Sequence, residues 1–187
     1  MLIRLRVGWE KKDGPAVVHG DLLRAAVVLL HAALEDLLRS IEERLLPEAG
    51  EAELNEILIP LVGGRKGQRR EKIQLGELSR YRGQTVDEVI QQAIEEHLRT
   101  QTYNNIEDIV RCLKRVGLRV EWQAEQKTLL RGMMQRRHLI AHRADRDHQR
   151  GARHHPLRSL EPEAVERWHG ALDGFGAAVL SALDERG

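Results

Sequence analysis

The chain has 187 residues, of which 41% are hydrophobic, 32% charged and 3% aromatic, with a formal net charge of +1. This length suits one domain with a sizeable core, and the balance of charges excludes a grossly basic or polyanion-coated protein. So few aromatic residues are atypical of a β-sandwich or barrel. The single cysteine excludes a disulfide framework and fits a reducing compartment. Because no apolar run is long enough for a membrane span or a signal peptide, we expect a cytoplasmic protein without a membrane partner.

The first third of the chain is expected to hold an arm, a long helix and part of an irregular insertion. The first nine residues alternate between apolar and polar types, which favours a short extended arm, assigned to 1–18. Three- and four-residue apolar spacing then predicts an amphipathic helix over 22–46, with Asp21 as its N-cap and Pro47 as its stop.

Residues 47–84 form the irregular, basic insertion. Its stretch 63–82 is rich in lysine, arginine and glycine, which indicates a flexible basic loop. Such a loop is either a solvated connector or a nucleic-acid contact, and the sequence leaves both open.

The second half of the chain carries clearer helix signals. Thr85 and Glu88 form a capping box for a helix to about 101, and Asn105 caps the next helix, which ends at Gly117. A further helix is expected from about Val120 to Arg143, a polar Arg/His-rich loop over 144–158, and a closing helix over 162–184 that begins with a first-turn proline. The sum predicts one all-α domain over 1–187, a bundle of four or five main helices.

One stretch combines basic residues and histidines with helical spacing. Residues 129–147 read LLRGMMQRRHLIAHRADRD. At about 100° per residue, Arg137, His138 and His142 share one side of this helix, beside its apolar face. That side is too polar for a core and too apolar for free solvent, so we expect it to meet a ligand or a partner.

An arginine and a histidine suit the cleavage of RNA by its own 2′-hydroxyl. An imidazole can take or give a proton near neutrality, and a guanidinium holds phosphate oxygens and neutralises their charge. This chemistry needs no metal and no cofactor, and DNA, without the 2′-hydroxyl, would be inert. Because one helix supplies one Arg/His set, two-fold pairing of two chains would place two sets around one phosphate.

The run Arg137–His142, RHLIAH, resembles the R-x4-H motif of HEPN domains, a superfamily of small α-helical ribonucleases and RNA-binding modules. The order of helices around it is similar to the RiboL-PSP-type or related HEPN groups. The resemblance implies a HEPN-like bundle with catalytic Arg137 and His142 and with His138 at the usual polar second position. It also implies a homodimer that cleaves RNA in a composite cleft, with a cognate antitoxin or regulatory protein, in a toxin–antitoxin or phage-defence setting.

Further basic residues near the motif are candidates for binding RNA. Arg136 offers an alternative register to Arg137, and the loop after the motif carries more arginines beside histidines. The candidate RNA-binding residues are therefore Arg136, Arg143, Arg146 and Arg150. Tyr103, Trp122 and Trp168 are candidates for base stacking, although the apolar stripes that hold the two tryptophans favour a core position.

Other interpretations of the same residues stay open. His138 and His142, four residues apart, are also spaced to bind zinc, with a third ligand from Asp145, His148, His154 or His155. The pair Arg137 and His142 could instead only stabilise the carboxyl end of its helix. At the level of the whole protein, the alternative to a ribonuclease is a non-catalytic HEPN-like RNA-binding or scaffolding module.

Overall fold

The computed structural model describes residues 16–59, 75–147 and 157–186. Over these residues the fold is all-α, as predicted, and the only β pairing there is an isolated antiparallel bridge between Arg146 and Leu157. The helices are α1 (Ala16–Leu45), α2 (Glu51–Leu54), α3 (Val86–Thr100), α4 (Ile106–Arg115), α5 (Ala124–Arg143) and α6 (Pro162–Asp184). There are also two 3-10 helices in the described residues: η1 (Leu46–Glu48) at the start of the expected insertion 47–84, and η2 (Leu75–Tyr81) within it, as is α2.

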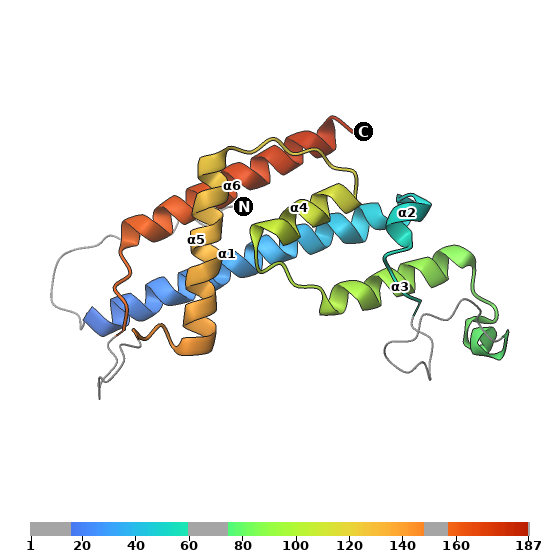
Figure 1. Cartoon of the computed structure of the whole chain (residues 1–187), viewed down its shortest axis with the longest axis horizontal. Helices are drawn as coiled ribbons and strands as arrows, with labels where there is room; N and C mark the ends of the chain where they lie inside the picture. The colour runs from blue at the N-terminus through green and yellow to red at the C-terminus, as the bar shows by residue number, and fades with distance from the viewer. Residues whose placement is uncertain (1–15, 60–74, 148–156, 187) are drawn as a thin grey trace.

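Helix α1 is the central element of the bundle. It contacts α3, α4, α5 and α6, and α5 crosses both α1 and α6 (Figure 1). The core between these helices is aliphatic, with few rings, as the composition suggests. Its largest fully buried apolar side chains are Leu34, Leu38, Leu46, Ile94, Leu98, Tyr103, Ile109, Leu130, Met133 and Phe175. Burial of these side chains is the main term that stabilises the fold.

The helix ends that carry local capping signals lie where the sequence predicts them. Thr85 and Glu88 exchange hydrogen bonds at the start of α3, and the Asn105 side chain accepts from the Asp108 amide at the start of α4. Gly117 follows α4 with a φ of +66°, in the left-handed region that favours glycine. Pro162 is the first residue of α6.

Two predicted helix starts are wrong. Helix α1 begins at Ala16, so 16–18 are helical instead of part of the arm, and Asp21 lies inside the helix instead of capping it. Helix α5 begins at Ala124 instead of near Val120, because Gln123 and Gln126 form a reciprocal cap there. Residues 1–15, which hold the rest of the expected arm, lie outside the described residues.

Two expected loops are only partly described. Most of the expected flexible stretch 63–82 lies outside the described residues, but its last part forms η2. Of the loop 144–158, residues 148–156 lie outside the described part.

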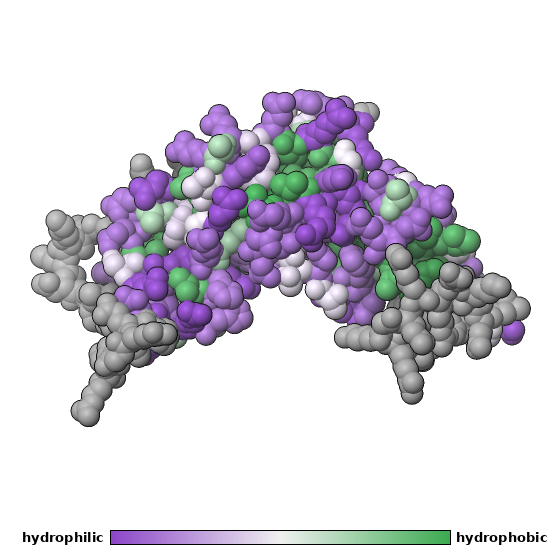
Figure 2. Space-filling model, in the orientation of Figure 1, coloured by the Kyte–Doolittle hydropathy of each residue, from purple (hydrophilic) through white to green (hydrophobic). Residues whose placement is uncertain are grey.

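The visible described surface is mostly polar, with scattered apolar patches (Figure 2). Of the helices in the described residues, none is both long and apolar enough to cross a membrane.

Candidate site on helix α5

The carboxyl-terminal half of α5 presents the predicted catalytic residues. The core face of α5 buries Leu130, Met133 and Met134, while the motif residues lie at or outside the edge of that face. His138 and His142 are exposed, and their rings lie 4.6 Å apart between centroids. Arg137 is half-buried and lies near enough to His31 on α1 for its charge to act on that imidazole. The structure thus brings the two imidazoles together at an accessible surface, one helical turn apart.

The side of α1 under Arg137 carries a histidine that sequence analysis did not single out. His31 is 1% exposed, its Nδ1 lies 3.8 Å from Oε2 of Glu35, and among the described residues its Nε2 has no hydrogen-bond partner. Burial lowers the pKa of His31, and the nearby Arg137 guanidinium lowers it further against the opposing effect of Glu35. His31 is therefore held neutral next to the candidate catalytic arginine.

The end of α5 is fixed by a buried carboxylate. Asp145 is 0% exposed, and its Oδ2 lies 2.8 Å both from Nε of Arg24 on α1 and from Nη2 of Arg136 on α5. The same two arginines donate to backbone carbonyls of the segment before α6: both contact the oxygen of Arg158, and Arg136 also contacts that of Ser159. We call Arg24, Arg136, Asp145 and these two carbonyls the Asp145 clamp.

The backbone of the clamp is unusual as well. Ala144 and Asp145 have φ values of 48° and 55°, a left-handed conformation that costs a non-glycine residue about 1–2 kcal/mol. The Asp145 amide donates to the Leu139 carbonyl at 3.0 Å, and the Asp145 carbonyl accepts from the Arg158 amide at 2.9 Å. The chain therefore turns sharply three residues after His142 and is pinned there from both sides.

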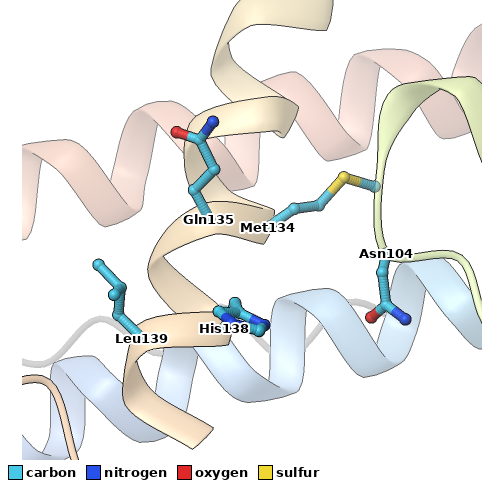
Figure 3. A pocket seen from close by; sticks show the side chains of 5 residues that line it. All are labelled: Asn104, Met134, Gln135, His138 and Leu139. Atoms are coloured by element: carbon cyan, nitrogen blue, oxygen red, sulfur yellow. The ribbon is translucent and has the colours of Figure 1, made fainter. Parts of the chain in front are cut away.

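A pocket of about 390 Å³ opens on the same face of α5. Met134, Gln135, His138 and Leu139 line it from the helix, and Asn104 lines it from the turn between α3 and α4 (Figure 3). Met134 is 4% exposed and so belongs both to the core and to the pocket wall. The pocket lies one helical turn, about 5.4 Å, before His142.

A second buried carboxylate lies at the far half of α1. Glu42 is 0% exposed; its Oε2 accepts from the hydroxyl of Tyr103, and its Oε1 lies 3.3 Å from Nη1 of Arg115. The same Nη1 atom of Arg115 donates to Nε2 of His97 at 3.0 Å. The Nε atom of Arg115 lies 3.4 Å from Oε2 of Glu56. We call these five residues the Glu42 cluster.

The aromatic candidates for base stacking lie in or against the core. Tyr103 is fully buried in the Glu42 cluster, so its ring is not available to an RNA base. Trp122 and Trp168 pack against the core, and Trp122 lies 4.9 Å from Phe175 between ring centroids. Both tryptophans are partly buried, so they lie at the edge of the core and not inside it.

The predicted RNA-binding arginines differ in their surroundings. The Arg136 guanidinium is occupied by the clamp, whereas Arg143, in the last turn of α5, is exposed. Arg146 is exposed and pairs through its backbone with Leu157. Arg150 lies outside the described residues, as do His148, His154 and His155. Of the proposed metal ligands that are described, Asp145 is already bound to two arginines, and no group of three or more candidate ligands occurs in the described part of the chain.

Three residues next to the motif were missed by sequence analysis: Asp145 as a buried anchor, His31 and Asn104. For His31 a signal exists, because it lies four residues after Val27 and three before Leu34, on the apolar stripe of α1. Asp145 and Asn104 owe their positions to contacts between distant segments, which no local pattern marks.

Comparison of the chain with protein-family models, with curated proteins and with solved structures finds no match.

Proposed function

We propose that this protein is a metal-independent endoribonuclease that uses Arg137, His138 and His142. The observation that carries the proposal is the exposed pair of imidazoles on α5, 4.6 Å apart, with a half-buried arginine beside them and a pocket next to them. The HEPN-like motif and the all-α order of helices support it as a resemblance.

In the proposed reaction the 2′-hydroxyl of a ribose attacks the neighbouring phosphorus. One imidazole removes the 2′ proton, and a second protonates the 5′ oxygen as the P–O bond breaks, which leaves a 2′,3′-cyclic phosphate and a 5′-hydroxyl. Arg137 neutralises charge on the phosphate oxygens in the transition state. His142 acts as general acid or base, and His138 orients the 2′-hydroxyl or shares the proton transfer.

The proposal includes a homodimer. Two copies of α5 facing each other across a two-fold axis would place an acid and a base on opposite sides of one phosphodiester. A cytoplasmic location and an antitoxin or phage-defence partner belong to the proposal on the ground of the resemblance.

The deciding experiment incubates purified protein with mixed cellular RNA in EDTA and analyses the new ends. We expect cyclic phosphates and 5′-hydroxyls from the wild type, and a rate about 10²–10⁴-fold lower for His142→Ala, with the oligomeric state unchanged. His169→Ala is the matched control, because His169 is an exposed histidine on α6 and is not part of the motif. If His142→Ala cleaves like the wild type, the assignment of this site is wrong. Retention of uncut RNA with a steep salt dependence would instead favour the non-catalytic RNA-binding module.

A further inference from the structure

The pocket beside His138 has a composition suited to a flat, polar-edged ring. The buried thioether of Met134 and the side chain of Leu139 supply apolar surface, and sulfur makes favourable contacts with aromatic rings. Asn104, Gln135 and the imidazole of His138 add hydrogen-bonding groups to the lining, with Met134 and Asn104 on one side of His138 and Gln135 and Leu139 on the other (Figure 3). A ring that stacks on His138 would meet donors and acceptors at its edge.

The backbone that carries Asn104 is held rigidly. Its own amide donates to Oδ2 of Asp108 at 3.0 Å, and the preceding amide, of Tyr103, donates to Glu35 on α1 at 3.4 Å. The Tyr103 side chain is fully buried, and its hydroxyl donates a hydrogen bond to Glu42. Asn105, which follows Asn104, caps α4. Asn104 therefore projects from a turn that is anchored on both sides.

The side chain of Asn104 is exposed and makes no hydrogen bond within the described part of the chain, unlike the asparagine that follows it. A primary amide presents one donor and one acceptor side by side, which matches the edge of a nucleobase. Sequence-specific recognition of RNA commonly uses such amide contacts to unstacked bases, together with stacking on aromatic or histidine rings. Here the supporting groups are already in place, so little ordering is needed on binding.

We propose that this pocket binds one base of a single-stranded RNA, next to the phosphodiester that reacts beside His142, and that Asn104 sets the base preference. This inference rests on the proposed function for its substrate, and it names the part of the site that selects the sequence. His138 would then have two roles: its ring stacks on the base, and its imidazole nitrogens face the ribose that reacts.

The test measures binding separately from cleavage. Fluorescein-labelled hexanucleotides of A, C, G or U, 2′-O-methylated throughout, cannot be cut by their own 2′-hydroxyl, so fluorescence anisotropy at fixed salt reports binding alone. We expect the wild type to bind one homopolymer about tenfold more tightly than the weakest one, and Asn104→Ala to remove most of this difference. Asn55→Ala is the matched control, since Asn55 is an exposed asparagine at the end of α2 and should leave the ranking unchanged.

A third variant separates base contacts from phosphate contacts. Arg143→Ala removes an exposed charge in the last turn of α5 and should weaken binding of all four homopolymers by a similar factor. An unchanged ranking in Asn104→Ala, a wild type that does not distinguish the bases, or no binding at all would each overturn the pocket assignment. If base selection by Asn104 is observed but unmodified RNA is not cleaved, the pocket assignment stands and the nuclease proposal fails.

Discussion

Among the described residues two carboxylates are buried, Glu42 and Asp145, and they are paired in different surroundings. Glu42 lies in the last turn of the long helix α1 and has a separate partner on each oxygen, Tyr103 and Arg115. Asp145 lies in a strained turn, takes both of its arginines on Oδ2, and leaves Oδ1 without a partner among the described residues. Glu42 thus joins regular helices to one another, whereas Asp145 fixes the chain immediately after the candidate catalytic helix.

This difference shows that the burial of a carboxylate does not by itself reveal which part of the protein the carboxylate stabilises. The Glu42 cluster connects α1 with α3, α4 and the residues after α2, and through Tyr103 it also supports the turn that carries Asn104. The Asp145 clamp connects α1, α5 and the segment before α6 within three residues of His142. We therefore expect changes in the cluster to act on stability and on the turn of Asn104, and changes in the clamp to act on the end of α5 at the motif.

The largest expected effect comes from Glu42→Ala. The change leaves the Arg115 charge and the Tyr103 hydroxyl buried without their main partner, and breaking such a pair costs about 3–5 kcal/mol. Chemical denaturation would measure this loss. Glu43→Ala, one residue away but exposed, should change the free energy of unfolding by less than about 0.5 kcal/mol. Equal effects of the two substitutions would contradict a buried role for Glu42.

Asp145→Asn should cost less, about 2 kcal/mol. Arg24 and Arg136 lose their counter-charge, but both are partly exposed and keep the carbonyls of Arg158 and Ser159. If RNA is cleaved, the rate should fall further than the folded fraction does, because the end of α5 is released. Asp173→Asn is the control, as Asp173 is exposed on α6. A cleavage rate that only follows the folded fraction would reduce the clamp to a structural role.

Acid should weaken the two regions unequally. Burial, and then the adjacent Arg115, lowers the pKa of His97 below its ordinary 6.5, against the opposing effects of Glu42 and Glu56. The unfolded chain then binds more protons, so this contribution to stability is complete above pH 6.5 and is lost as the pH falls below it. The clamp itself contains no histidine, but the pKa of the buried His31 on α1, near Arg137 of α5, is lowered as well. In a His31→Gln background, hydrogen exchange between pH 7.5 and 5 should therefore show α3 and α4 opening before the end of α5.

A matched pair of variants checks the source of that acid sensitivity. His97→Gln keeps an acceptor for Arg115 without a titrating ring, so its free energy of unfolding should fall less steeply with acid than that of the wild type. His169→Gln, exposed on α6, should follow the wild type. Parallel curves for all three proteins would show that His97 is not the group responsible.

The smallest expected effect is a gain. Ala144→Gly relieves a left-handed residue beside Asp145, and after the extra backbone entropy of glycine the net stabilisation should be about 0.5 kcal/mol. Ala141→Gly, in the regular part of α5, should instead destabilise by about 1 kcal/mol. Thermal unfolding of both variants distinguishes the two signs, and a destabilised Ala144→Gly would contradict the strain.

The sequence predicts those parts of the fold that local chemistry decides. Thr85, Asn105, Gly117 and Pro162 mark helix ends by their own capping or backbone preferences, and the structure confirms them. The start of α1 is not predicted in this way, because Asp21, the capping residue that the pattern favours, lies inside the helix.

In the candidate site, too, local patterns predict some residues and contacts between distant segments determine the others. Helical spacing places His138 and His142 on one exposed face, which the structure shows, while the proton transfers assigned to them remain a proposal. Nothing local distinguishes Asp145 from Asp147 within the run RADRD, although one is buried and the other half-exposed. Asn104 becomes part of the pocket only because the turn after α3 lies against α5.

The single thiol of the chain has a practical consequence. Cys112 is 2% exposed in α4, and burial raises the pKa of its thiol. Thiol-directed alkylating reagents should therefore react with Cys112 only slowly. A cysteine introduced by Ala141→Cys, between the two motif histidines, would be the one accessible handle for a nitroxide label. Dipolar spectroscopy on that labelled protein would return a single inter-label distance if two α5 helices meet face to face, and no dipolar signal if the protein is monomeric.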